Sequence, residues 1–327
     1  MPIWTRALAL AMVVTATSSA SALAGPVADR IKAGRIIRCG AVERPGLLEP
    51  GQDGTPRGLL VDLCRAFGVA AAGPSVAVAM DFYDADATYD AVRAGSEDVF
   101  FLTGSEIVDQ KLAGKIMPGP VVFAETSALM VAEGSGAQRP ADLAGQPICF
   151  LQGDASHRHL EAFFAARRVA FVRMGYQEES ELYDAFDAQV CPAMAGEATT
   201  LARVRLEGGK NRRNGRILSE PLASFPILAA TSPRDGEWSA VVSWTFATLI
   251  DADRPKQDWA AGGLDSLPLE AAGLGLEAGW QKTVLAAGGG YAQMLRRNVG
   301  DASPLKLPAG LNALAGAGGL MTPPYAE

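Results

Sequence analysis

Residues 147–194, PICFLQGDASHRHLEAFFAARRVAFVRMGYQEESELYDAFDAQVCPAM, alternate between short apolar runs and longer stretches with apolar residues at helical spacing. The short runs predict buried strands, and the longer stretches predict amphipathic helices. The predicted elements are strands at 147–151, 169–174 and 189–194 and helices at 156–168 and 178–186. Strands that alternate with helices are typical of a parallel sheet covered on both faces.

The same alternation occurs earlier in the chain. Its predicted elements are strands at 36–42, 76–82 and 98–102 and helices at 59–72 and 87–94. Extended apolar segments at 127–132 and 222–230 connect the two copies, and further helices are predicted at 238–252, 277–286 and 291–298. We therefore predict an α/β fold of two doubly wound lobes joined by two crossing strands, with a ligand cleft between them. Residues 25–128 and 226–327 are assigned to lobe 1, and residues 129–225 to lobe 2.

The first 24 residues have the pattern of a secretory signal peptide. Arg6 is the only charge before Asp29, an apolar stretch runs from Ala7 to Thr17, and residues 22–24 read Ala-Leu-Ala. This order predicts cleavage after Ala24 and export to the periplasm. The alternative, a membrane anchor, is disfavoured because the apolar stretch is shorter than the roughly 20 residues that a spanning helix needs.

Charge and motif content exclude several classes of function. Without Arg6, the remaining chain has 28 basic and 36 acidic residues, a net charge of −8, which disfavours nucleic acid and anionic membranes as partners. His157 and His159 are two positions apart on a predicted helix, so they do not share a face and predict no metal site. The chain has no G-x-G-x-x-G motif after a strand, no P-loop and no G-x-S-x-G, and we expect no cofactor.

Four cysteines, Cys39, Cys64, Cys149 and Cys191, stand in apolar or half-apolar segments. None belongs to a C-x-x-C pair, so zinc and thioredoxin chemistry lack support. Export to an oxidising compartment would favour disulfides. Four cysteines allow three pairings, and the sequence by itself does not choose among them.

Several segments resemble the polar amino-acid-binding proteins of ABC importers, the family-3 solute-binding proteins, and among them the general L-amino-acid-binding type. The similar segments are 34–40 (GRIIRCG), 57–66 (RGLLVDLCRA), 148–153 (ICFLQG) and the tail with 297–300 (RNVG), 303–305 (SPL), 310–312 (GLN) and 318–321 (GGLM). The resemblance covers nearly all of the exported chain. It implies the two-lobed binding-protein fold and disulfides Cys39–Cys64 and Cys149–Cys191, one in each lobe.

The family's ligand-binding motifs are altered in this chain. The resemblance places Leu102 where the family has an arginine that pairs with the ligand carboxylate, and it places Glu197 where an acidic residue accepts the ligand ammonium. The family's glycine-threonine-threonine turn corresponds to Gly153-Asp154-Ala155-Ser156, and its aromatic platform corresponds to the segment that contains Leu47. The resemblance thus implies a cleft lined by Glu43, Leu47, Phe101, Leu102, Thr103, Gly153, Asp154, Ala155, Ser156 and Glu197.

Two of these residues have alternative interpretations. Asp154 could simply cap the following helix, and Glu197 could be a first-turn glutamate that favours the helix dipole. A cleft that has lost its cation would bind a carboxylate poorly, because burying an unpaired charge costs several kcal/mol. We therefore expect a neutral, cationic or largely apolar ligand rather than a standard free amino acid, and we expect Leu102→Arg to improve amino-acid binding.

The resemblance favours a monomeric periplasmic solute-binding protein that delivers a small solute to an ABC permease and has no enzymatic activity. One alternative is a degenerate binding protein that acts as a periplasmic partner, as relatives associated with methanol dehydrogenases do. A further alternative is an enzyme similar to cyclohexadienyl dehydratase. That alternative is disfavoured because its substrate carboxylates also need cations.

Overall fold

The computed structural model describes residues 25–109, 112, 114–254 and 271–322. The predicted signal peptide with its cleavage site after Ala24 lies outside the described residues. In the first half of the chain the elements are α1 (Pro26–Gly34), β1 (Ile36–Val42), β2 (Glu49–Pro50), β3 (Pro56–Arg57), α2 (Leu59–Ala72), β4 (Ala77–Tyr83), α3 (Ala85–Ala94), β5 (Val99–Thr103), α4 (Gly104–Ile107) and β6 (Val121–Val131).

The second half begins with β7 (Pro147–Leu151), α5 (Ala155–Ala166), β8 (Val172–Tyr176), α6 (Glu179–Asp187), β9 (Ala193–Glu197), α7 (Ala198–Glu207), α8 (Lys210–Asn214), β10 (Arg216–Ile217) and β11 (Ala223–Ala230). The helices α9 (Gly236–Asp251), α10 (Trp280–Gly288) and α11 (Tyr291–Asn298) follow. Short 3₁₀ turns lie at Pro140–Leu143, Ala271–Leu274, Gly310–Asn312 and Ala315–Ala317.

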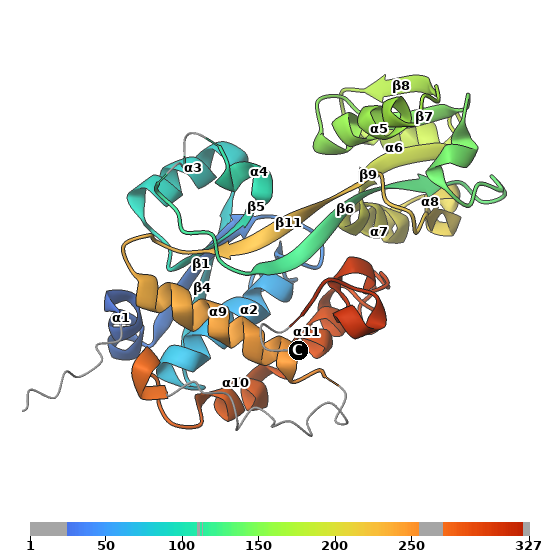
Figure 1. Ribbon diagram of the computed structural model, residues 1–327. Coiled ribbons are helices and arrows are strands. Elements are labelled where there is room, and N and C mark those ends of the chain that lie inside the picture. The colour runs from blue at the N-terminus through green and yellow to red at the C-terminus, as the bar shows by residue number, and fades with distance from the viewer. Residues whose placement is uncertain (1–24, 110–111, 113, 255–270, 323–327) are drawn as a thin grey trace, which may run out of the picture.

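The two lobes share one sheet, which confirms the predicted two-lobed α/β fold. Its strand order is β4-β1-β5-β11-β6-β9-β7-β8, with β10 paired to β6. Strands β4, β1 and β5 of lobe 1 and strands β8, β7 and β9 of lobe 2 pair in parallel, whereas β11 pairs antiparallel with β5 and β6, and β6 pairs antiparallel with β9. Strands β2 and β3 form a separate antiparallel pair. Figure 1 shows β6 and β11 running side by side as the connection between the lobes. We refer to β6 and β11 as the hinge strands.

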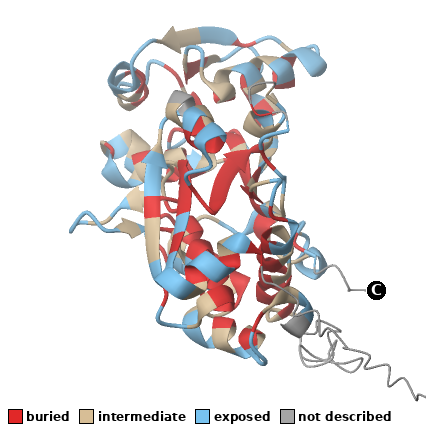
Figure 2. Ribbon diagram, turned by 90° about the vertical axis from the view of Figure 1, so that its left-hand side faces the viewer, coloured by how far each residue is buried: buried red, intermediate tan, exposed pale blue. Residues whose placement is uncertain are grey.

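Apolar side chains fill both faces of the sheet in each lobe. In lobe 1, α2, α9, α10 and α11 cover one face around Trp238, and the α3 side holds a smaller cluster with Phe100 and Leu102. In lobe 2, α5 covers one face with Phe163 and Phe164, and α6 and α7 cover the other. Figure 2 shows the buried residues gathered along the central strands and the helices packed against them.

Each lobe contains one disulfide, as the resemblance implied. Cys39 of β1 is bonded to Cys64 of α2, and Cys149 of β7 is bonded to Cys191 just before β9. The bonded residues are 25 and 42 positions apart. Loops of this length correspond to about 3–4 kcal/mol of stabilisation on the loop-entropy account. Neither bond crosses between the lobes.

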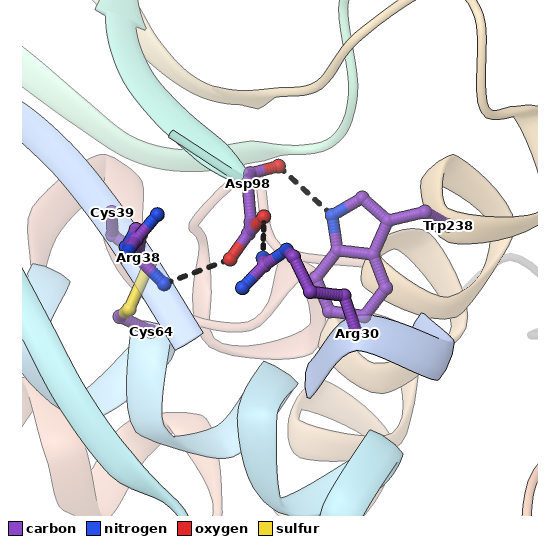
Figure 3. Close-up of a disulfide and its surroundings, with 6 residues drawn as sticks. All are labelled: Arg30, Arg38, Cys39, Cys64, Asp98 and Trp238. Carbon is purple, nitrogen blue, oxygen red and sulfur yellow. Dashed lines mark hydrogen bonds and ion pairs between the residues drawn. A yellow bond between two sulfur atoms is a disulfide. The ribbon is translucent and has the colours of Figure 1, made fainter. Parts of the chain in front are cut away.

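The start of β5 is held in place next to the first disulfide (Figure 3). The Asp98 carboxylate accepts a hydrogen bond from the Arg38 backbone N–H at 2.8 Å and pairs with the guanidinium of Arg30. The indole N–H of Trp238 donates to the backbone carbonyl of Asp98 at 2.9 Å. These contacts tie α1, β1 and α9 to β5, which pairs with β1 and with the hinge strand β11.

The C-terminal part of the chain binds the hinge strand β6. The Asn312 side chain accepts a hydrogen bond from the Ala124 N–H at 2.7 Å and donates one to the Ala124 carbonyl at 3.0 Å. The Tyr291 hydroxyl donates to the Val122 carbonyl at 2.9 Å. Along this stretch β6 has β11 on its other side, so these side chains occupy the place of a neighbouring strand.

Candidate functional site

The loop after β1 holds an arginine at the boundary between the lobes. Arg44 and Leu48 exchange two backbone hydrogen bonds, each 2.9 Å long, which close a tight loop. Leu47 and Leu48 are fully buried and anchor this loop in the lobe 1 core. Gly58 packs against it with φ +127°, and a Cβ on Gly58 would come within 2.2 Å of the Leu47 carbonyl oxygen. The loop is therefore fixed, and Arg44 is left free to reach lobe 2.

The partner of Arg44 is Glu197, the last residue of β9. Its carboxylate Oε2 lies 3.4 Å from Arg44 Nε, and the two side chains are 17% and 18% exposed. Glu197 occupies the N-cap position of α7 but makes no side-chain capping bond, so its carboxylate is available to other partners. Burial raises the pKa of Glu197; Arg44 opposes this increase and Asp154 adds to it.

These residues line a cavity of about 240 Å³ between the β1 loop and lobe 2. Its charged lining residues are Arg44 and the carboxylates Glu43, Asp154, Glu179 and Glu197. The expectation of a cleft without a cation is therefore wrong for this cavity, because Arg44 supplies one. The local balance is nevertheless acidic, with four carboxylates around one guanidinium.

The turn before α5 contributes Asp154 to this cavity. Asp154 accepts a hydrogen bond from the Ser156 N–H at 3.2 Å, so it caps α5 and lines the cavity at the same time. Gly153 has φ +84°, a left-handed conformation that glycine adopts without strain. Ala155 is the first residue of α5, and Ser156 is buried, with its hydroxyl 3.5 Å from that of Ser127 on β6.

Four of the residues that the resemblance placed in the cleft are packed inside lobe 1. Leu47 and Phe101 belong to the main core, and Leu102 is 1% exposed in the cluster on the α3 side. Thr103 caps α4 in a reciprocal arrangement with Glu106. In this arrangement of the lobes Leu102 packs against apolar side chains, so Leu102→Arg is now expected to bury a charge instead of improving binding.

A further carboxyl lies on the hinge strand β6, next to the ion pair. Glu125 is 1% exposed; its Oε2 accepts a hydrogen bond from the Thr199 hydroxyl at 2.6 Å, and its Oε1 accepts one from the Thr126 N–H at 2.8 Å. Burial and the negative charge of Glu197 raise the pKa of Glu125 to about 7, whereas the two hydrogen bonds and Arg44 act in the opposite direction. Glu125 is thus electrostatically coupled to both members of the pair.

More contacts join the two lobes on the side of α7. Glu49 of β2 pairs with Arg57 at 2.9 Å and with Arg203 of α7. The Arg205 guanidinium donates to the Leu305 carbonyl at 2.8 Å. Beyond them, a cavity of about 590 Å³ lies between β6, α7 and the C-terminal segment, and Glu125, Arg205, Lys306 and Asn312 are among its lining residues.

Sequence reasoning missed Arg44 and Glu125. Arg44 follows the carboxyl end of a predicted strand, which is where open α/β sheets place ligand-binding side chains. Glu125 is the only charged residue in the largely apolar run VVFAETSALMV, which becomes the first hinge strand. A lone carboxylate in a strand of this kind is the signal that could have identified it.

Two other features, a metal site and a membrane-spanning helix, are absent from the part of the chain that the structure describes. It contains no group of three or more His, Cys, Asp or Glu side chains placed to hold a metal ion. Across the same ranges, no helix combines the length and the apolar character that crossing a membrane requires.

Comparison with known proteins identifies relatives that align with nearly the whole chain. The general L-amino acid-binding periplasmic protein AapJ of Rhizobium johnstonii is 26% identical over 332 residues, 97% of either chain. The glutamate/glutamine/aspartate/asparagine-binding protein BztA of Rhodobacter capsulatus is 25% identical over 336 residues, also 97% of either chain. The putative amino-acid ABC transporter-binding protein YhdW of Escherichia coli is 22% identical, with the same coverage. No protein-family model matches the chain.

Solved structures agree with these relatives. An ABC transporter periplasmic binding protein from Brucella ovis with glutathione bound has a TM-score of 0.71 and 25% identity, over 90% of this chain and 97% of that one. The second substrate-binding domain of a putative amino acid ABC transporter from Streptococcus pneumoniae has a TM-score of 0.53 at 16% identity, over 65% of this chain and 93% of that one, which supports the fold alone.

The relatives are binding proteins of transporters rather than enzymes, and they lend no support to the accessory-partner alternative. Similarity along the whole chain and the two-lobed fold lead to one conclusion: the chain is a homologue of the amino-acid-binding periplasmic proteins of ABC transporters and has the fold of the family-3 periplasmic solute-binding proteins.

Proposed function

We propose that this protein captures a zwitterionic or cationic solute with an amino-acid headgroup, as a free amino acid or a short peptide, and delivers it to an ABC permease. The observation that carries the proposal is the Arg44–Glu197 ion pair, which joins a lobe 1 loop to the end of a lobe 2 strand. In this proposal the ligand carboxylate binds Arg44, and the ligand ammonium binds Glu197.

The ion pair can be replaced by a ligand at low cost. The pair is loose, because its Nε–Oε2 distance of 3.4 Å exceeds the roughly 2.7–2.9 Å of a charge-assisted hydrogen bond. A guanidinium–carboxylate contact with good geometry contributes about 1.5–3 kcal/mol per charge-assisted hydrogen bond. A zwitterion that inserts between Arg44 and Glu197 exchanges one loose contact for two good ones. It also bridges the lobes, as closure around a ligand requires.

The acidic lining sets the preferred charge of the ligand. Glu43, Asp154 and Glu179 surround the ion pair with negative charge. A second ammonium or guanidinium group on the ligand is favoured there, and a second carboxylate is repelled. We therefore expect glutamate and aspartate to bind weakly, and basic amino acids or peptides with a free amino terminus to bind best. The Brucella ovis neighbour holds glutathione, so short peptides belong among the solutes to be tested.

The remaining parts of the proposal follow from the relatives and from the sequence. Secretion by the predicted signal peptide, with cleavage after Ala24, would place the protein in the periplasm with its relatives. The proposed lobe boundaries, between 128 and 129 and between 225 and 226, fall within the two hinge strands. Rotation about these strands would open and close the cleft while each disulfide stays within one lobe.

Calorimetry tests this function directly. Purified protein is titrated with arginine, lysine, glutamine, glutamate, glutathione and a basic dipeptide. We expect arginine, lysine and the basic dipeptide to bind tightly and glutamate to bind weakly. Glu197→Gln and Arg44→Gln should each weaken the tight ligands about ten- to a hundredfold. Glu181→Gln, an exposed carboxylate on α6, is the matched control and should leave affinity unchanged. Tight binding that both cleft variants retain would refute the assignment.

A further inference from the structure

The hinge strand β6 carries a carboxyl group that the proposed ligand contacts do not use. Glu125 is 1% exposed and belongs to β6, the strand that Figure 1 shows passing from lobe 1 to lobe 2. Among the described residues, no arginine, lysine or histidine forms an ion pair with it. A buried ionised carboxylate normally needs such a partner, so another group must compensate its charge or the carboxyl must hold a proton.

The contacts of Glu125 suit either protonation state. When the carboxyl is ionised, Oε1 and Oε2 accept hydrogen bonds from the Thr126 N–H and the Thr199 hydroxyl. When it is protonated, Oε1 still accepts from Thr126, and the Oε2–H donates to the Thr199 oxygen, since a hydroxyl can both donate and accept. Both contacts can thus be made in either state, although the hydrogen bonds favour the ionised carboxylate. Burial acts most strongly against that state, and the surrounding charges shift the balance further.

The charges that act on Glu125 include both members of the Arg44–Glu197 pair. Glu197, which precedes Thr199 by two residues, raises the pKa of Glu125, and Arg44 lowers it. Arg205 of α7 and Lys306 of the C-terminal segment line the same 590 Å³ cavity as Glu125, and Asp154 acts on Glu197. His159 of α5 contacts Ser127, two residues further along β6, with its Nδ1 2.7 Å from the serine hydroxyl. With a pKa of about 7, Glu125 is poised to respond to a change at the Arg44–Glu197 pair.

We propose that Glu125 is a positioning residue through which the charge of the ligand controls a proton on the hinge, an inference that rests on the proposed function. A ligand cation that neutralises Glu197 removes the repulsion on Glu125, and the proton on its Oε2 leaves to solvent. A ligand carboxylate that neutralises Arg44 has the opposite effect and favours the protonated carboxyl. An amino-acid headgroup engages both residues, so these two effects oppose each other. The additional cation of a basic ligand then favours release of the proton, and the additional carboxylate of an acidic ligand opposes release.

The coupling can be measured first without any ligand. Carbon-13 NMR of the glutamate side chains follows Glu125 between pH 4 and 9 in the full exported chain, and Glu125→Gln identifies its resonance. We expect Glu197→Gln to lower the pKa of Glu125 and Arg44→Gln to raise it, each by about half a unit or more, whereas Glu181→Gln leaves it unchanged. A carboxyl that titrates in its ordinary range, or one that does not respond to Glu197→Gln, would overturn the inference.

Ligand binding provides the second measurement. At pH 7, a fall in the pKa of Glu125 from about 7 to about 6 releases roughly 0.4 protons per ligand. Calorimetry with arginine in buffers of different ionisation enthalpy should detect this release, and Glu125→Gln should abolish it. Release that persists in Glu125→Gln would assign the proton to another group and refute the inference. If no solute in the panel binds, the proposed function fails, and the NMR titration still decides the role of Glu125.

Discussion

The pH dependence of stability gives the sharpest test of the raised pKa of Glu125, the buried carboxyl on β6. The pKa of Glu125 is raised from 4.5 to about 7 in the folded chain, chiefly by burial. Between pH 4.5 and 7, the folded protein therefore holds a proton on Glu125 that the unfolded chain has released. The protonated Glu125 stabilises the folded state relative to the unfolded state. This contribution is fully present below about pH 4.5 and is lost as the pH rises through 7.

The magnitude follows from the size of the shift, which corresponds to about 3 kcal/mol between the ends of this range. Glu125→Gln removes the titration and keeps both contacts. Its amide oxygen can accept from the Thr126 N–H, and its NH₂ group can donate to the Thr199 hydroxyl. The variant thus resembles the protonated state at every pH.

Denaturant unfolding of the wild type and Glu125→Gln at several pH values from 4.5 to 8 measures the effect. We expect the stability of the variant relative to the wild type to increase by about 3 kcal/mol over this range. Other carboxyls with raised pKa values, such as Glu97 and Asp253, affect both proteins equally and cancel in the difference. Glu181→Gln is the control. A difference between wild type and Glu125→Gln that stays constant with pH would refute the reasoning.

Three further predictions concern the fold and its motion. Leu102→Arg should destabilise the protein by about 3 kcal/mol or more, because it puts a guanidinium among the apolar residues of the α3-side cluster; an unfolding midpoint equal to that of the wild type would contradict this placement. Peptide mapping without reductant should find only the two bonds within the lobes, and replacing either cysteine pair by alanine should cost roughly 3–4 kcal/mol in denaturant unfolding. A tight ligand should reduce the radius of gyration measured by solution scattering, and an unchanged radius would argue against closure about the hinge strands.

The fold could be predicted from sequence because its strands are short apolar runs separated by periodic helices. The strand predicted at 147–151 and the helix predicted at 59–72 coincide with β7 and α2. The boundaries of the hinge strands were harder to predict from the sequence. The predicted extended segment 127–132 is only the end of β6, which begins at Val121, because the polar Glu125 and Thr126 interrupt the apolar pattern. Tertiary pairing with β11 keeps this stretch in the sheet despite its composition.

The site was harder to predict because motif alignment says little about which way a side chain points. Asp154 and Glu197 do line the interlobe cavity, together with Glu43. Side chains alternate between the two faces of a strand, and a motif does not determine which face a given residue occupies. Leu102 is apolar, and it packs in the cluster on the α3 side. The position of Arg44 depends on the geometry of its loop. That geometry is set by the burial of Leu47 and Leu48 and by the close packing of Gly58, and no sequence motif marks these three residues.

The contact between Asn312 and β6 also bears on how this protein avoids aggregation. A strand with unpaired N–H and C=O groups is a template onto which a strand of another molecule can add. By bonding both backbone groups of Ala124, Asn312 closes that edge with a side chain, which leaves no new edge behind it. The C-terminal segment thus covers this edge of β6, and we expect a chain truncated before Asn312 to expose the edge and to self-associate more readily.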